Sequence, residues 1–264
     1  MQTKYFAVQI HVPDQGNVLL RKALKEVNAN PELKTLWEIT NTNAITRLGF
    51  TDHGPVHFQI VANLALKITR ILIEKGIEMS VVRDYELTNA HAELIVFLGS
   101  IMHDLGMSIE RDGHEEMSLF LANNILRETL GFLNPREKTI VISEVLHTII
   151  SHRSGGSPLT IEAGIVRVAD ALDMSKGRSR IPYQKGSTNI HAVSAAAIDN
   201  ITISEGKTKP VNIQINMNNS AGIFQIDELL KQKVKGSGLE KYLNIRASLD
   251  RATEKKLMQE FELA

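Results

Sequence analysis

Ser100-Ile101-Met102-His103-Asp104-Leu105-Gly106 closes the most apolar segment of the chain. With Thr88 as a candidate N-cap, the segment from residue 90 predicts a helix that is buried on most sides. An adjacent imidazole and carboxylate are costly to bury at the end of such a helix unless something compensates them. A divalent cation would compensate both, because it binds neutral His and ionised Asp. Gly99 and Ser100 are small and would leave room for the ion.

Composition limits the kind of chemistry that this chain can perform. Its 264 residues, 43% of them hydrophobic, suffice for a sizeable core and for two domains. Thirty Lys and Arg residues balance thirty Asp and Glu residues, which argues against a dedicated nucleic-acid binder. The chain has no cysteine, so a metal site must use His and carboxylate ligands. No signal-peptide pattern or long apolar run is visible, so we expect a cytoplasmic protein without a membrane partner.

Apolar residues at helical spacing predict further helices on both sides of the His103-Asp104 pair. Asp52 and Asp112 are the predicted N-caps of the helices that follow them, and Pro55 suits a first helical turn. The stretch 6–10 is either an edge strand or an extended arm. The expected helices cover residues 18–27, 31–48, 55–73, 90–102, a segment that opens at 111–116, 135–152 and 161–174.

Several candidate ligands stand near the ends of these helices. His57 lies in the first turns of its helix, and His53 shares its face if that helix begins early. His114 lies at a helix start, and His152 falls on the buried side of the last turn of its own helix. His147 falls on the opposite side with three polar residues, so we interpret it as a surface residue; these neighbours are Ser143, Glu144 and Ser151.

Each candidate has an ordinary structural alternative. The His103-Asp104 pair could be a buried hydrogen bond, and His53 and His114 could be turn or capping residues. Asp170 and Asp173 lie off the apolar stripe of their helix, which also fits two solvated carboxylates. The order of the candidates along the chain is therefore more informative than any one of them.

A basic segment follows the last predicted helix of this group. Residues 176–185 carry four Lys or Arg residues and no acid. Such cations are ordinarily solvated or pair with acids of another domain. Beside a metal site they are well suited to hold an anionic substrate, because guanidinium geometry matches phosphate oxygens.

The ordered set of His57 before an Ile-Val-Ala run, His103-Asp104 with Leu105-Gly106, and Val168-Ala-Asp-Ala-Leu-Asp173 resembles the HD superfamily of metal-dependent phosphohydrolases. The resemblance covers about residues 45–185. It implies that His57, His103, Asp104 and Asp170 are the core metal ligands. Members with two metals add histidines between the pair and the last Asp, where His114 and His152 fall. His53 is included as a further candidate ligand.

The resemblance also implies a reaction. One or two ions of Mn, Fe, Co, Ni, Zn or Mg would activate a water molecule that attacks a small phosphorylated substrate, which we expect to be a nucleotide. Asp104 would be the catalytic residue, and the expected substrate-binding residues are Arg111, Lys176, Arg178 and Arg180. The alternative is a catalytically degenerate HD-domain protein that binds a nucleotide as a regulatory or scaffold module. Met107 stands where the cyclic-dinucleotide-cleaving branch has a lysine, and the signatures of that branch and of the deoxynucleotide triphosphohydrolases are not visible.

The pattern changes after residue 185. Residues 190–198 predict a short Ala-rich helix, and 201–203, 211–217 and 242–249 alternate with the period of strands. A helix that Ser220 would cap separates the second strand from the third. We therefore expect an α+β protein with a helical HD-type domain at residues 1–185 and a small β-β-α-β module at 186–264. Because so small a sheet rarely stands alone, it should dock on the helical domain or on a second subunit, and we expect a homo-oligomer.

Overall fold

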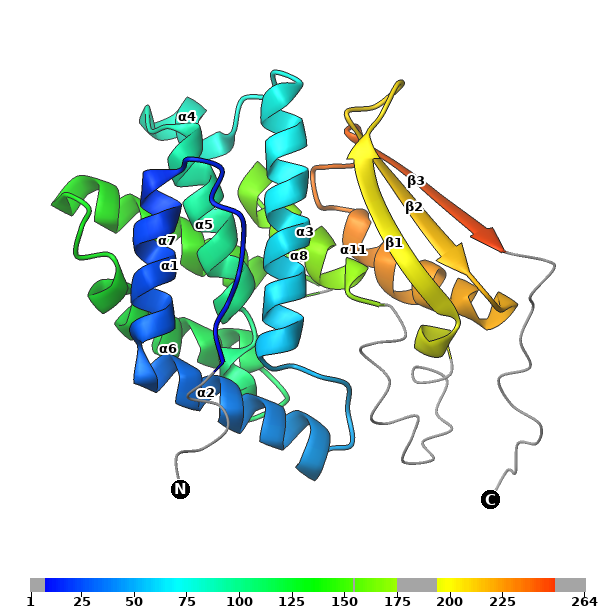
Figure 1. Cartoon of the computed structure of the whole chain (residues 1–264), viewed down its shortest axis with the longest axis horizontal. Coiled ribbons are helices and arrows are strands. Elements are labelled where there is room, and N and C mark those ends of the chain that lie inside the picture. Colours follow the sequence, from blue (N-terminus) through cyan, green and yellow to red (C-terminus); the bar gives the residue numbers. More distant parts are fainter. Residues whose placement is uncertain (1–7, 154, 175–193, 250–264) are drawn as a thin grey trace.

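A computed structural model describes residues 8–153, 155–174 and 194–249 of the chain. Helices form a bundle on one side, and a three-stranded sheet lies beside α3 on the other (Figure 1). The predicted α+β class is confirmed. The helical part contains α1 (Val18–Ala29), α2 (Pro31–Asn41), η1 (Thr42–Arg47), α3 (Pro55–Glu74), α4 (Ser80–Tyr85), α5 (Asn89–Met102), η2 (Leu105–Ser108), α6 (His114–Thr129), α7 (Pro135–Ser151) and α8 (Ile161–Leu172).

The apolar helix α5 is the centre of the bundle. It packs against α1, α3, α7 and α8, and nearly all of its side chains from Ala92 onward are buried. Thr88 is its N-cap, as predicted. The explanation proposed for Gly99 is wrong, because a Cβ at this position would collide with the side chain of Thr148 on α7. Gly99 leaves room for the neighbouring helix rather than for an ion.

Two predicted helix caps are also wrong. Gly54 is the N-cap of α3, while Asp52 Oδ1 accepts a hydrogen bond from the Gly54 amide at 2.8 Å. Gly113, with φ +71°, precedes α6 in place of Asp112. Gly113 makes its positive-φ turn without a steric penalty, whereas Gly54 has an extended backbone and a Cβ there would collide with Asn41.

The segment before α1 is an extended arm over its described residues. Ile10 donates its amide hydrogen to Asn28 Oδ1 and accepts a hydrogen bond from Asn28 Nδ2, at 2.8 and 2.9 Å. The helix expected at 31–48 divides into α2 and the single π-helical turn η1. Asn43, in that turn, donates to the carbonyl of Met107 at 2.8 Å and so ties η1 to the loop after the His-Asp pair.

The surface assignment of His147 is wrong. Its ring is half-buried, and Nε2 accepts a hydrogen bond from the amide of Leu159 at 2.9 Å. Glu144 and Ser151, which share its side of α7, are buried as well. The chain between α7 and α8 turns back over this side of the helix, which helical periodicity alone does not indicate.

The C-terminal module has the predicted β-β-α-β order. Strand β1 (Ile198–Glu205) pairs antiparallel with β2 (Val211–Met217), and β2 pairs parallel with β3 (Leu243–Leu249). The connection that precedes β3 is less regular than expected. Asn219, not Ser220, caps a 3₁₀ turn, η3 (Ser220–Gly222), and the π turn η4 (Gln225–Leu230) and α11 (Lys231–Val234) follow it. Of the expected Ala-rich helix, residues 194–196 are helical, and Ile198 already begins β1.

One face of this sheet is apolar and faces the protein. Val211, Ile213 and Ile215 of β2 are fully buried. The opposite face carries a ladder of amide side chains, in which Asn216 donates to Asn200 and Asn244 donates to Asn212 at 2.7 and 2.8 Å. The predicted boundary at 185/186 lies outside the described residues.

Helix α3 is the single described helix that is long and apolar enough to cross a membrane. Within the fold, 61% of its apolar window is buried. It lies between the bundle and the sheet and contacts both (Figure 1). Contacts on two sides are typical of a helix in the core of a folded protein.

Candidate metal centre

Six predicted ligands converge at one end of the bundle, although they come from five different helices or their ends. His57 lies in the first turn of α3, and His103 and Asp104 end α5. His114 begins α6, His152 is the C-cap of α7, and Asp170 lies in the last turn of α8. All six residues are at least nine-tenths buried, with exposed fractions of 0–8%.

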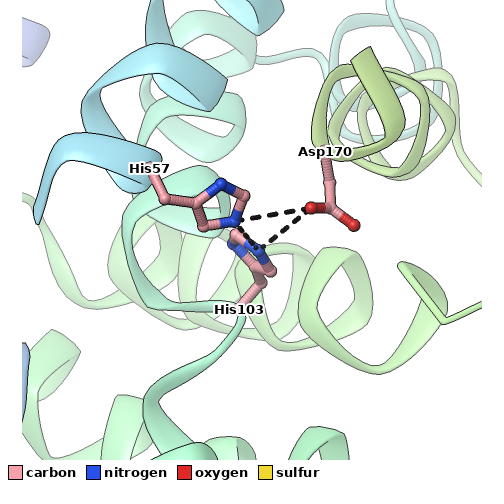
Figure 2. A group of neighbouring side chains, drawn as sticks. All are labelled: His57, His103 and Asp170. Carbon is pink, nitrogen blue, oxygen red and sulfur yellow. Dashed lines mark hydrogen bonds and ion pairs between the residues drawn. The ribbon is translucent and has the colours of Figure 1, made fainter. Parts of the chain in front are cut away.

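The first group of ligand atoms consists of His57 Nε2, His103 Nε2, Asp170 Oδ1 and Asp104 Oδ2. The two nitrogens are 3.2 Å apart, and each lies 3.5–3.6 Å from Asp170 Oδ1 (Figure 2). Asp104 Oδ2 lies 3.6 Å from His57 Nε2 and 3.3 Å from His103 Nε2. Ligand atoms that share one ion at about 2.0–2.2 Å lie roughly 2.9–3.6 Å apart in octahedral or tetrahedral coordination. The group therefore has the dimensions of a single ion site.

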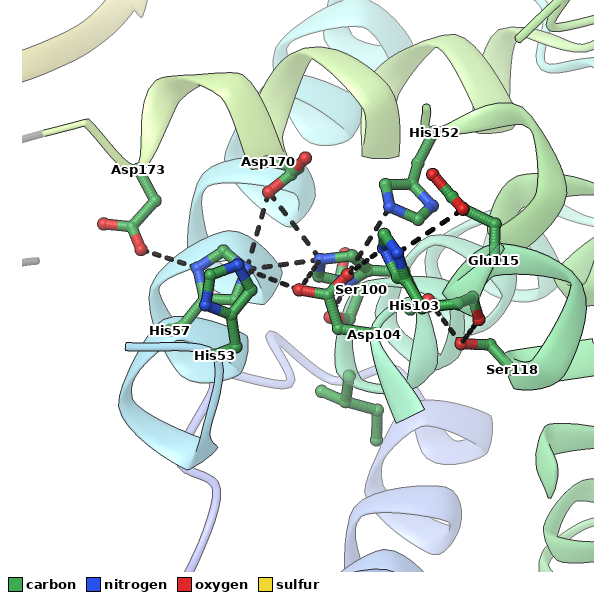
Figure 3. A network of polar contacts seen from close by, with 12 residues as sticks. His53, His57, Ser100, His103, Asp104, Glu115, Ser118, His152, Asp170 and Asp173 are labelled. Atoms are coloured by element: carbon green, nitrogen blue, oxygen red, sulfur yellow. Dashed lines mark hydrogen bonds and ion pairs between the residues drawn. The ribbon is translucent and has the colours of Figure 1, made fainter. Parts of the chain in front are cut away.

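A second group surrounds the other carboxylate oxygen of Asp104. Its Oδ1 lies 3.1 Å from His114 Nε2 and 3.5 Å from His152 Nε2. His114, Glu115 and His152 each offer a ligand atom within 4.8 Å of the others, so these three residues together could hold an ion. Figure 3 shows Asp104 between the two groups. One carboxylate thus faces both groups, each through a separate oxygen.

The other ring nitrogen of every one of these histidines faces a hydrogen-bond acceptor. Nδ1 of His103, His114 and His152 lies 2.9, 2.9 and 2.6 Å from the carbonyl oxygens of Ser100, Arg111 and Ile149. Nδ1 of His57 lies 2.6 Å from Asp173 Oδ2. These acceptors hold one proton on Nδ1 and turn Nε2 towards the carboxylates, which is the orientation that a metal-binding imidazole needs. Such outer partners fix the tautomer of metal-binding histidines.

This arrangement fits a cation. In the neutral forms that bind a metal, with Nδ1 protonated, His57 and His103 would direct two acceptor nitrogens 3.2 Å apart towards the same solvent-inaccessible position. Two lone pairs at this distance repel each other unless a positive charge lies between or beside them. The nitrogen and oxygen donor set, with no thiolate, suits a divalent transition metal or Mg.

The electrostatics of the centre also favour positive charge, which a second proton on His103 or a bound cation can supply. Burial alone would lower the pKa of His103, but Asp104 and Asp170 outweigh it and raise the pKa to about 10. Burial opposes ionisation of Asp104, yet its histidine neighbours hold the pKa of this carboxyl well below its usual range. The pKa of Asp170 is lowered in the same way, chiefly by Lys233. Both carboxylates are therefore ionised at neutral pH.

Sequence reasoning missed three groups at this centre. The solvated alternative for Asp173 is wrong, because this residue is 2% exposed and orients His57. Glu115 joins the second group, and Lys233 donates to Asp170 Oδ2. The Ala-Leu-Asp ending of α8 offered a signal for Asp173. Lys233 is 63 residues from its partner, so no local pattern could indicate it.

The remaining predicted site residues lie at the periphery or outside the described chain. The His53 ring is 5.8 Å from the His57 ring, but His53 belongs to none of the groups that could share an ion. The exposed Arg111 lies against the Phe50 ring, with Nη1 3.2 Å from His114 Nδ1, so it borders the second group. Lys176, Arg178 and Arg180 lie outside the described residues.

Comparison with known proteins agrees with this geometry. The HD domain family model matches residues 56–175, the span that contains all six ligands. A protein of Methanocaldococcus jannaschii, named "Uncharacterized protein MJ1020", is 43% identical over 239 residues, which cover 90% of this chain and 92% of the relative. No solved structure gives a significant match. The chain belongs to the HD-domain family, as its sequence predicted.

Proposed function

We propose that this protein is a metal-dependent phosphohydrolase that acts on a small phosphorylated compound. The observation that carries the proposal is Asp104, whose two oxygens face two separate groups of ligand atoms. Buried carboxylates that connect two ligand groups are suited to paired ions about 3.5–4 Å apart, an arrangement that many phosphate-ester hydrolases use.

The protein residues would have distinct tasks in this reaction. His57, His103, Asp104 and Asp170 hold the first ion, and the second group, His114 with His152 and Glu115, holds another. When bound, a divalent cation supplies Lewis acidity that activates water at neutral pH and offsets the charge of phosphoryl oxygens. Asp173 and the backbone carbonyls near the other histidines keep the Nε2 atoms directed at the centre, so no reorganisation is needed.

A nucleotide is the substrate class that we favour. Arg111 borders the second group, and its guanidinium lies over the Phe50 ring, 5.5 Å from the ring centroid, so a cation and an aromatic ring stand at the edge of the centre. Arg178, Arg180 and Lys176 follow Asp170 closely in sequence and would supply further cations for the phosphate chain. The alternative is a degenerate member that binds a nucleotide without turnover.

A turnover screen separates the two functions. Protein loaded with Mn, Co, Zn or Mg is incubated with mono-, di- and cyclic nucleotides and with simple phosphate esters, and released phosphate or nucleoside is measured. We expect hydrolysis that chelation abolishes and metal addition restores. Binding of a nucleotide at stoichiometric amounts, with no turnover under any metal, would support the degenerate alternative instead.

A further inference from the structure

Lys233, from the C-terminal module, reaches the metal centre. Its Nζ donates to Asp170 Oδ2, and its side chain is 15% exposed. Asp170 Oδ1, the other oxygen, is the atom that faces His57 and His103. The lysine therefore occupies the side of the carboxylate that the first ligand group does not use, and it need not leave when an ion binds.

A buried arginine fixes the backbone that carries this lysine. Arg167, one turn before Asp170 on α8, is 2% exposed. Its guanidinium donates to the carbonyl oxygens of Lys233 at 2.8 Å and Gln232 at 3.2 Å. It also donates to the carbonyl oxygen of Gly156 at 2.5 Å, in the loop that follows His152. A single side chain thus holds the module, the loop and α8 together around the centre.

Lys233 places a positive charge at the edge of the first ligand group, because its ammonium contacts the Asp170 oxygen that is turned away from His57 and His103. An ammonium has three N–H donors, and among the described residues its hydrogen bond goes to Asp170. A buried ion pair is weak evidence of a purely stabilising role, because desolvation offsets much of its Coulomb energy. A cation with unused donors beside a metal centre suits an oxyanion.

We propose that Lys233 binds a phosphoryl oxygen of the substrate, so that the C-terminal module completes the active site of the helical domain. This inference rests on the proposed function and adds a substrate-binding residue to it. It also gives the module a role, because the contacts of Arg167 and Lys233 bring a separate part of the chain to the ligands.

The test compares Lys233→Met with Lys231→Met, a matched control on the same short helix. Lys231 is 73% exposed and pairs with Asp227 instead of the metal centre. Mn-loaded wild-type and variant proteins are titrated with inorganic phosphate by calorimetry, and Mn content and the melting temperature are measured in parallel. We expect phosphate affinity to fall roughly tenfold or more in Lys233→Met and to change less than about twofold in Lys231→Met, with Mn content kept.

Lys233→Gln keeps the test valid if the Met variant does not fold. Its amide can still donate to Asp170 while the charge is lost, so it should also bind phosphate weakly. If the Met or Gln variant binds phosphate as tightly as the wild type, and the wild type hydrolyses a phosphate ester, the proposed role of Lys233 is wrong. The proposed function of the protein would then still stand. Loss of Mn in step with phosphate would likewise overturn the role of Lys233, since the lysine would then only position Asp170. A wild-type protein that neither binds phosphate nor hydrolyses any ester overturns both proposals.

Discussion

The Nδ1 atom of His57 lies 2.6 Å from Oδ2 of Asp173, and both side chains are buried. Asp173 belongs to neither ligand group, yet it determines which nitrogen of His57 faces the centre. The two residues are 116 positions apart, so the contact joins the start of α3 to the end of α8. It makes the orientation of a ligand dependent on the packing of two helices.

The first prediction concerns this contact. Asp173→Ala should weaken Mn affinity by about 10–100-fold, because His57 loses the partner that orients it. Asp173→Asn should fall between the Ala variant and the wild type, since its amide oxygen can still accept from Nδ1. Competition with a chelating dye measures the affinity, and Asp227→Ala is the control at an exposed carboxylate. Equal affinities in all four proteins would exclude this role.

The second prediction concerns the carboxylate between the two groups. Asp104→Ala should lower bound metal by roughly tenfold or more, because both groups lose an oxygen ligand at once. The far-UV circular dichroism of the variant should retain most of the helical signal. Mass spectrometry of metal content provides the measurement, with Asp84→Ala as the exposed control. Unchanged metal content would show that the ligand assignment is wrong.

The third prediction concerns the number of ions. The double variant His114→Ala, His152→Ala should reduce the Mn stoichiometry from two to one, since the first group remains complete without these side chains. In a crystal soaked with excess Mn, the wild-type ions should lie about 3.5–4 Å apart. A single ion in the wild type, with both histidines turned away from it, would contradict the second site.

The fourth prediction concerns the basic segment after Asp170. The double variant Arg178→Ala, Arg180→Ala should lower kcat/KM at least tenfold, about 1.4 kcal/mol of transition-state stabilisation, on whichever substrate the screen finds. The melting temperature should stay nearly unchanged. If the two arginines only pair with acids of the module, the melting temperature will fall first and turnover will be kept.

The fifth prediction concerns a buried carboxyl group far from the ligand groups. Burial raises the pKa of Glu162, whose Oε1 accepts a hydrogen bond from the Val81 amide. Because the folded-state pKa exceeds the unfolded value, the protonated form of Glu162 stabilises the fold below the unfolded pKa. That stabilisation is lost as pH rises through the folded pKa. Glu162→Gln keeps a hydrogen-bond acceptor and removes the charge. Its melting temperature at pH 8 should therefore exceed that of the wild type, by about 2–4 °C for each kcal/mol gained in the free energy of unfolding.

Melting curves at pH 4 and pH 8 test this sign. The difference between Glu162→Gln and the wild type should be smaller at pH 4, where the wild-type carboxyl is protonated in the folded state and largely protonated in the unfolded state. Exposed Glu128→Gln is the control and should change little at either pH. A Glu162→Gln variant that melts lower at pH 8 would contradict the prediction.

Local sequence signals were sufficient to predict the helices of the bundle and the order of the ligands along the chain. The apolar run before His103 and the period of Ile165, Val168 and Leu172 depend on neighbours within a few turns, and the helices they predict are present. The position of Asp170 near the end of its helix then brought it to the centre, as the resemblance implied.

Contacts between elements that are far apart in the sequence could not be predicted from local sequence patterns. Asp173, Lys233 and Arg167 meet their partners through the docking of separate elements, and a helical wheel gives no information on which element will cover a given side. The same limitation explains His147, which the chain before α8 covers. The misplaced caps have a different cause, because a Gly stands between each predicted Asp and its helix: Gly113 takes a positive φ, and Gly54 packs against Asn41.

The distance in sequence between Asp170 and Lys233 has a consequence for synthesis of the protein. All six ligands precede the lysine, which follows Asp170 by 63 residues. At roughly 5–20 residues per second, translation adds these residues in about 3–13 s. A growing chain therefore acquires the full set of groups for capturing an ion several seconds before the residue proposed to contact the substrate has been made.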